Sequence, residues 1–401
     1  MSAAEAFTCH IQPARSILRG HDFTDAWFVA RFGMNLYRGC QHGCAYCDGR
    51  AERYRVQGEF DRDIVVKSNA LSLLERELSR LAEPGFVFLG GGVSDAWQPA
   101  EAEHRLARGA LELLHARGFP VHVLTKSALV ERDLDLLAAI HQRSRAILSF
   151  SIQTTDDTVR QRYEPGAAPI ALRWRLLRRA KAMGLVTGVM AMPVLPGISD
   201  QPEAIDALLE QAADAGADFV LCSGLTLRPG IQKQAMLDAL ARHQPDLVQG
   251  YRAIYRAHRP SGGADPRYAC RLQERFAAAL ARYRLPDRIP RWVFGGLLPQ
   301  YAEAAVLLEH RQHALAAQGQ RAPWLGRSGM ALQRWAGAAL RGLGRKRGPR
   351  GWQQVEQRFR EMLERRELGR IDGMDTRALP ELQAIIQPMP PPRGLAQLSL
   401  L

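Results

Sequence analysis

Residues 38–47 read Arg38-Gly39-Cys40-Gln41-His42-Gly43-Cys44-Ala45-Tyr46-Cys47, so three cysteines stand on one short stretch. Three thiolates on one loop can bind three irons of a cubane iron–sulfur cluster and leave the fourth iron open to a small-molecule ligand. Zinc is the alternative, but structural zinc normally takes four ligands, usually from two short Cys/His pairs. The other cysteines, at positions 9, 222 and 270, are scattered singly. The stretch therefore predicts an iron–sulfur site at Cys40, Cys44 and Cys47.

Downstream of this stretch, short apolar runs alternate with amphipathic segments between Phe86 and Ser223. This pattern is typical of repeated βα units on a parallel sheet. We expect the first strand to run into Asn35-Leu36 and the others to span 86–89, 121–124, 146–151, 186–192 and 219–222. Helices are expected over 69–80, 103–117, 134–142, 171–183 and 203–214. Six units predict an α/β protein with an open (βα)6 partial TIM barrel, whose chemistry lies at the carboxyl ends of the strands.

Residues with ligand-binding potential follow three of these strands. The triplet Gly90-Gly91-Gly92 either lets backbone approach a ligand or forms a flexible turn. Lys126 is one of only five lysines in the chain and either pairs with an anionic ligand or extends to the surface. Ser149, Ser151 and Gln153 alternate on one face of a strand, where they bind ligand groups or local backbone.

The cysteine stretch resembles the signature of the radical S-adenosylmethionine (SAM) enzymes, Cys-x3-Cys-x2-Cys with an aromatic residue before the last cysteine. Tyr46 fills that aromatic position. The longer string over 35–44 resembles the branch related to spore photoproduct lyase, and the resemblance covers about 16–223 and extends loosely to 290. It implies a 4Fe-4S cluster and SAM as cofactors, with flavodoxin or ferredoxin as the one-electron donor. It also implies reductive cleavage of SAM to a 5′-deoxyadenosyl radical, which abstracts hydrogen from a substrate.

The resemblance also suggests roles for individual residues. It implies that the glycine triplet meets the amino group of SAM. If SAM binds there, the charge of Lys126 is expected to pair with its carboxylate, and the polar groups at 149, 151 and 153 are expected to bond its ribose hydroxyls or carboxylate. Arg162 and the turn containing Pro196 and Gly197 resemble strings of the same branch, the turn being either a shelf for the adenine or a plain connection. Spore photoproduct lyase has a hydrogen-donating cysteine just upstream of a Ser-Asp pair, whereas this chain has Val93 before Ser94-Asp95. Cys222 is the alternative donor, or else a small core residue.

Four regions are expected: an N-terminal lead-in over 1–28, the radical SAM core barrel over 29–230, a mostly helical extension over 231–385, and a Pro-rich, disordered tail over 386–401. Helices of the extension are expected near 302–317, 332–343 and 352–367. The basic loop Arg341–Arg350, flanked by Trp335 and Trp352, either binds nucleic acid or is a solvated loop.

The formal net charge of +13 also suggests an acidic partner, although most of the basic residues are arginines, as GC-rich coding favours. The chain has no run of eighteen apolar residues and no secretory leader pattern, so no membrane association and a cytoplasmic location are expected. Two functions therefore follow from the sequence. One is a radical SAM enzyme acting on an unidentified substrate, with nucleic acid as a candidate. The other is a non-catalytic metal- or cluster-bearing nucleic-acid-binding protein.

Overall fold

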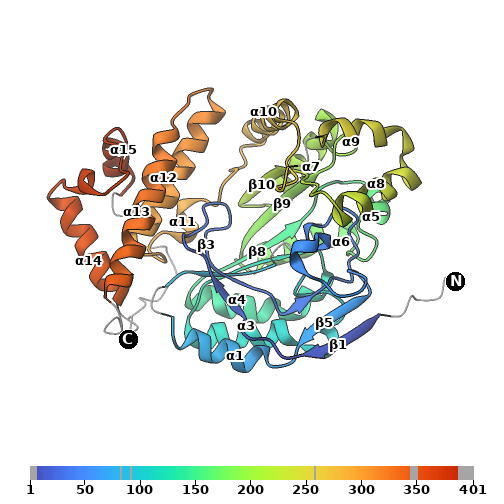
Figure 1. Cartoon of the computed structure of the whole chain (residues 1–401), viewed down its shortest axis with the longest axis horizontal. Helices are drawn as coiled ribbons and strands as arrows, with labels where there is room; N and C mark the ends of the chain where they lie inside the picture. Colours follow the sequence, from blue (N-terminus) through green and yellow to red (C-terminus); the bar gives the residue numbers. More distant parts are fainter. Residues whose placement is uncertain (1–6, 82–83, 91–92, 257–258, 344–350, 387–401) are drawn as a thin grey trace.

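Figure 1 shows the computed structural model of the chain, which describes residues 7–81, 84–90, 93–256, 259–343 and 351–386. Its central sheet has the strand order β10-β9-β8-β7-β6-β3-β2. The parallel strands are β3 (Ala30–Met34), β6 (Phe86–Leu89), β7 (Val121–Thr125), β8 (Ala146–Ser151), β9 (Val186–Val194) and β10 (Phe219–Gly224), and β2 (Leu18–Gly20) is antiparallel to β3. The parallel strands follow one another in chain order, and β10 and β2 are the two edges of the sheet. The predicted α/β class and open barrel are therefore confirmed.

Alternation along β8 explains how the barrel forms. Leu148 and Phe150 belong to the hydrophobic core that the sheet shares with its outer helices, because successive strand residues point to opposite faces. Ile147 belongs to a second core. Ser149 hydrogen-bonds His122 of the neighbouring strand, and Ser151 lines a cavity. The polar residues of β8 therefore share the inner face of the barrel.

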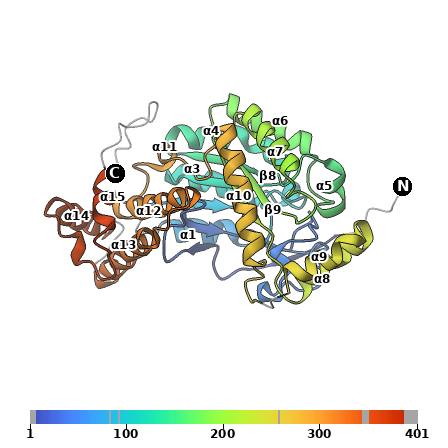
Figure 2. The same ribbon diagram turned by 90° about the horizontal axis from the view of Figure 1, so that it is seen from above.

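The helices match the predicted βα rhythm. Those of the barrel are α1 (Ala70–Leu78), α2 (Glu101–His104), α3 (Leu106–Arg117), α4 (Leu134–Arg143), α5 (Asp157–Tyr163), α6 (Ile170–Ala182) and α7 (Pro202–Asp214). Beyond β10 lie α8 (Ile231–His243), α9 (Val248–Ile254), α10 (Pro266–Tyr283), α11 (Arg291–Phe294), α12 (Gln300–Ala317), α13 (Pro323–Gly342), α14 (Gly351–Glu364) and α15 (Ala378–Ile385). In Figure 2, α10 runs between the C-terminal helices α12–α15 and the pair α8 and α9.

The helices differ from the sequence prediction in several places. The helix expected over 103–117 is divided at Arg105, whose left-handed φ of 51° separates α2 from α3. The helices α5, α8, α9, α10, α11 and α15 were not predicted individually. α13 begins nine residues before the predicted start, with Pro323 in its first turn. Gly329 lies in this earlier part of the helix and packs against α12. A Cβ at Gly329 would lie 2.9 Å from the carbonyl oxygen of Ala305, so a glycine that weakens the helical pattern here permits close helix packing.

The N- and C-terminal regions both pack onto the barrel. β1 (Thr8–Gln12), β5 (Asp63–Lys67) and β4 (Tyr37–Arg38) form a separate three-stranded sheet in the order β1-β5-β4. The backbone N–H of Thr24 donates to the side-chain carbonyl of Gln333 on α13 at 2.5 Å. One hydrophobic core joins Phe86 and Phe219 at the starts of barrel strands with residues of α12 and α13, which include Ala305 and Leu332. The lead-in and the helical extension therefore share a core with the barrel.

The basic loop lies mostly outside the described residues, which stop at 343 and resume at 351. Trp335, expected beside it, packs edge-on against Tyr301 and against Phe359, with ring centroids 6.4 and 6.2 Å away. Trp352 packs against the same core. Both indoles therefore contribute to helix packing, and the expected nucleic-acid contact stays a prediction. The Pro-rich tail predicted over 386–401 lies outside the described residues from 387 onward.

Candidate active site

The cysteine loop lies at the carboxyl ends of the barrel strands. Cys40, Cys44 and Cys47 line one cavity of about 510 Å³, here called the cysteine cavity. Its walls also include residues at or just beyond the ends of β6 to β10, among them Gly90, Lys126 and Ser151. The structure thus brings together three cysteines and three candidate ligand-binding residues that are far apart in the sequence. Tyr46 lines the same cavity and is buried.

Backbone contacts fix the start of the cysteine loop. The N–H of Cys40 donates to the carbonyl of Phe60 at 2.9 Å, and the side chain of Gln98 bonds both Gln41 N and Gly39 O. Gly39 has φ of +80°, and a Cβ there would lie 2.7 Å from the carbonyl oxygen of Asp63. This position therefore requires glycine. The thiols are held in low-dielectric surroundings, and burial raises the pKa of all three, that of Cys44 to about 12.

Asp95 connects the cysteine loop to the strand ends. Its carboxylate contacts His42 Nε2 at 3.1 Å, and it accepts hydrogen bonds from Thr125 Oγ1 at 2.8 Å and from the backbone N–H of Lys126 at 2.8 Å. The other ring nitrogen of His42 lies 3.0 Å from the carbonyl of Gly166. Burial raises the pKa of Asp95, whereas His42 and the backbone hydrogen bonds lower it. The lowering effects are together the larger, so the pKa of Asp95 lies below its ordinary value. Asp95 therefore stays ionised and holds three segments in register.

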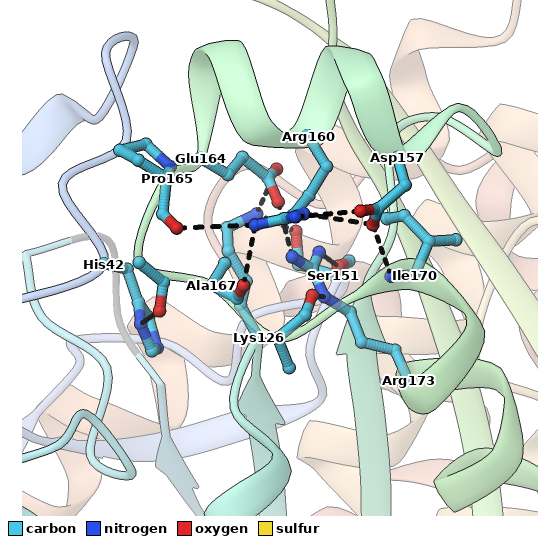
Figure 3. Close-up of polar contacts among 12 residues, drawn as sticks. His42, Lys126, Ser151, Asp157, Arg160, Glu164, Pro165, Ala167, Ile170 and Arg173 are labelled. Carbon is cyan, nitrogen blue, oxygen red and sulfur yellow. Dashed lines mark hydrogen bonds and ion pairs between the residues drawn. The ribbon is translucent and has the colours of Figure 1, made fainter. Parts of the chain in front are cut away.

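Lys126 takes part in a buried ionic network, shown in Figure 3. Its ammonium lies 3.1 Å from Glu164 Oε1 and donates to Ser151 Oγ at 2.6 Å and to Tyr46 Oη at 3.2 Å. Glu164 also accepts from the Tyr46 hydroxyl and, through its other oxygen, from Arg173 at 2.7 Å. Burial raises the pKa of Glu164, but Lys126 and Arg173 lower it to about 2. In this structure the partner of Lys126 is thus a protein carboxylate.

A buried arginine on α5 orients the segment that carries Glu164. Arg160 forms a two-point ion pair with Asp157, with Nε–Oδ1 and Nη2–Oδ2 distances of 3.0 and 2.8 Å, and donates to the carbonyls of Pro165 and Ala167 (Figure 3). Arg162, the sequence candidate two positions later, is exposed. Residues two apart on a helix point to nearly opposite sides, so only one of the two arginines can face inward.

Several other candidates lie away from the cavity walls. Ser149 is held by His122, and its hydroxyl lies 2.9 Å from Nε2 of that ring. Pro196 and Gly197 form a turn in which the N–H of Gly197 donates to Asp200, and a Cβ at Gly197 would lie 3.0 Å from Leu247. Gln153 is buried, and neither its amide oxygen nor its amide nitrogen has a hydrogen-bond partner among the described residues. Gly91 and Gly92 lie outside the described residues.

Sequence reasoning missed two features of the site. Arg173 was not singled out, and Glu164 and Asp95 were noted only as parts of strings that resemble the branch, without a role in a buried network. The exposed fractions of the Glu164, Arg173 and Asp95 side chains are only 1%, 0% and 9%. The segment Ser223–Thr226 was not singled out, although it forms a wall of the cavity just beyond β10. Arg173 stands between Leu172 and Trp174 in the helix predicted over 171–183, and this charge between large apolar residues was the available signal for it.

The fold and this site define an enzyme-like open barrel with a three-cysteine loop at the mouth. The sequence profile of the Radical SAM superfamily matches residues 34–209. An uncharacterized protein of Mycobacterium tuberculosis (strain H37Rv) is 36% identical over 259 residues, which cover 64% of this chain and 75% of that protein. An uncharacterized protein of Methanocaldococcus jannaschii is 27% identical over 172 residues, 43% of this chain and 63% of its own length. The chain therefore belongs to the radical SAM superfamily, and it is an enzyme of that class.

A solved structure of much lower sequence identity confirms the fold. Spore photoproduct lyase complexed with dinucleoside spore photoproduct superposes with a TM-score of 0.53 at 16% identity, covering 69% of this chain and 79% of that one. At this identity the likeness concerns the fold. None of the helices in the described part of the chain is both long and apolar enough to cross a membrane.

Proposed function

We propose that this enzyme binds a 4Fe-4S cluster through Cys40, Cys44 and Cys47 and uses it to cleave SAM reductively, so that hydrogen is abstracted from a substrate. The single observation that carries this proposal is the cysteine cavity, in which three buried or half-buried thiols and the ends of five strands face one space. When bound, the cluster would supply one electron to SAM, which then divides into methionine and a 5′-deoxyadenosyl radical.

The donor set fits a cluster better than a single ion. Among the described residues, no three His, Cys, Asp or Glu side chains are grouped closely enough to hold one metal ion. Structural zinc needs such a compact tetrahedral group. In a cubane cluster each thiolate binds a different iron, so the three sulfurs can stand farther apart around a shared cavity.

The chain offers several groups for SAM beside the cysteine loop. Gly90 lines the cysteine cavity; its φ is +132°, and a Cβ there would lie 2.2 Å from the carbonyl oxygen of Leu124, so this position of the wall requires glycine. Tyr46 lines the cavity from the cysteine loop and Lys126 lines it from the segment after β7. Both side chains donate hydrogen bonds to Glu164, which fixes their positions. We propose that Lys126 orients the carboxylate of SAM from this network and that Tyr46 closes one side of the site. Their fixed positions would exclude water from the reacting carbon.

Gln153 provides a test of stability. It is buried, lies outside the walls of the cysteine cavity, and neither polar atom of its amide has a hydrogen-bond partner among the described residues. A buried amide without a partner is costly. We therefore expect Gln153→Met to leave the free energy of unfolding unchanged or raised and SAM affinity unchanged, as measured by urea unfolding and calorimetry. The control is Gln161→Met, an exposed glutamine on α5. Lower stability would assign the Gln153 amide to packing, and weaker SAM binding would show that bound SAM reaches it.

The experiment that tests the proposed function is anaerobic reconstitution followed by assay. We expect about four iron and four sulfide per chain, as three thiolates and an open iron require. With dithionite and SAM, the protein is expected to release 5′-deoxyadenosine even without substrate. One equivalent of zinc with no iron chromophore would contradict the proposal.

The electron donor, substrate and location remain predictions. Flavodoxin or ferredoxin would supply the electron, and a reducing cytoplasm would preserve the thiolates. Cys222 as hydrogen donor and nucleic acid as substrate are separate hypotheses. Deuterium incorporated from D2O into product, lost in Cys222→Ser, would support the first.

A further inference from the structure

A second cavity of about 410 Å³ lies beside β10, on the open side of the barrel. We call it the lateral cavity. One wall is α10, which crosses the free edge of the barrel in Figures 1 and 2. The segment after α10 is tied to the same edge, because the N–H of Val220 donates to the carbonyl of Pro286 at 2.9 Å. The volume lies in the range of small-molecule sites, about 300–1,000 Å³.

The lateral cavity has an apolar wall and a charged end. Leu272, Phe276 and Leu280, spaced three to four residues apart, line it from one face of α10. Arg288, Asp287 and His313 also line the cavity and supply its charged groups. Such a combination suits a ligand with an apolar body and one polar end.

Arg288 is the cationic residue of the lateral cavity that is available to bind an anionic ligand. Its guanidinium stacks over Trp27, 4.4 Å from the ring centroid, and Nη1 donates to the backbone carbonyl of Asp287 at 2.5 Å. Among the described residues, no carboxylate oxygen lies within the 4.0 Å ion-pair distance of this guanidinium, although Asp25, Asp287 and Glu309 are near enough to affect its pKa.

The neighbouring carboxylate is already engaged. Asp287 is hydrogen-bonded to Nε2 of His313, a residue of α12. Asp25 accepts the backbone N–H groups of Trp27 and Phe28 at 2.9 and 2.7 Å. A half-buried guanidinium without a direct counter-ion is an unfavourable arrangement that an anionic ligand would relieve.

The two cavities meet at one segment. Residues from Ser223 to Thr226 line both the lateral cavity and the cysteine cavity. The pairing of β10 with β9 shifts register between Cys222 and Gly224, so the strand loses its regular path there. Cys222 lines the lateral cavity. A ligand lying across this segment would therefore have its two ends in different cavities.

We propose that the lateral cavity binds the anionic end, a carboxylate or phosphate, of an elongated substrate whose apolar body runs along α10 and whose reacting carbon lies in the cysteine cavity. This inference rests on the proposed function, because it assigns a substrate class to the same site. Arg288 is the anion-binding residue.

Calorimetry on the reconstituted protein tests binding with four probes that share one chain: octanoate, octyl phosphate, octylamine and 1-octanol. We expect the two anions to bind and the amine and alcohol to bind at least about ten-fold more weakly, because a charged hydrogen bond is lost. The carboxylate and phosphate arms identify the preferred anion. Arg288→Gln is expected to remove the preference, and Arg271→Gln, an exposed arginine on α10, to retain it. Equal binding of all four probes, or none at millimolar concentration, overturns the inference.

A second pair of variants guards against misfolding of Arg288→Gln. Ala277 lines the lateral cavity, whereas its neighbour Ala278 is exposed on the same helix. Ala277→Trp is expected to abolish octanoate binding and Ala278→Trp to preserve it. Unchanged binding in Ala277→Trp would show that the ligand lies elsewhere.

Label transfer separates this inference from the proposed function. With SAM, dithionite and perdeuterated hexadecanoate or its phosphate analogue, hexadecyl phosphate, wild-type protein is expected to form deuterated 5′-deoxyadenosine, and Arg288→Gln to form mainly unlabelled product. Unlabelled 5′-deoxyadenosine from the wild type overturns the substrate class while the proposed function stands. If no 5′-deoxyadenosine forms at all, the proposed function itself fails.

Discussion

Cys44→Ala is expected to yield a protein with no 4Fe-4S cluster and no detectable release of 5′-deoxyadenosine. Cys44 is buried, lines the cysteine cavity, and stands between Cys40 and Cys47 on the same loop. A cubane cluster with one open iron needs three thiolate ligands, and the variant keeps only two. Iron and sulfide analysis, the visible absorption of the reconstituted protein, and chromatography of the SAM cleavage products measure the effect.

The matched controls are Cys9→Ala and Cys270→Ala, because both cysteines are exposed and lie outside the cysteine cavity. Both proteins are expected to carry the full cluster. Cys40→Ala and Cys47→Ala are expected to behave like Cys44→Ala. A normal cluster and normal SAM cleavage in Cys44→Ala would remove this residue from the ligand set.

The second large effect is expected from Arg173→Met, which should lower the free energy of unfolding by about 3–5 kcal/mol. Arg173 is fully buried and donates to Glu164 at 2.7 Å and to the carbonyls of Ser151 and Ala168, both at 2.8 Å. Its removal leaves the buried Glu164 carboxylate with one partner fewer and takes away the guanidinium donor of the Ser151 and Ala168 carbonyls. Urea unfolding of the two reconstituted proteins measures the difference.

Arg179→Met is the control on the same helix. Arg179 pairs with Glu131, but 56% of its side chain is exposed, and exposed pairs contribute about 0–1 kcal/mol. Because Glu164 also holds Lys126 and Tyr46, Arg173→Met is expected to weaken SAM affinity as well. A loss of less than 1 kcal/mol, matching Arg179→Met, would mean that the buried pair adds no net stability.

The barrel was predictable because the sequence patterns of its strands and helices each lie within a short stretch of the chain. β6 and β8 have the predicted bounds, Phe86–Leu89 and Ala146–Ser151. Buried parallel strands read as short apolar runs, and the amphipathic segments between them must cover the sheet. The parts that failed depend on distant partners. β1 is exposed along its whole length and is a strand because it pairs with β5.

The sequence by itself determined the class of chemistry, because the spacing of Cys40, Cys44 and Cys47 and the aromatic Tyr46 lie within one short loop. Only the tertiary structure decided what surrounds that loop. Glu164 lies in the segment before α6, and Arg173 lies nine residues later on α6. Glu164 pairs with Arg173 and with Lys126, and these ion pairs depend on the burial of Glu164 and Arg173 together. The lateral cavity likewise exists because the extension folds back along β10 and sets Arg288 beside Trp27. Such contacts arise only when distant segments pack together, because the cost of removing a charge from water is offset by the partner that the same packing brings to it.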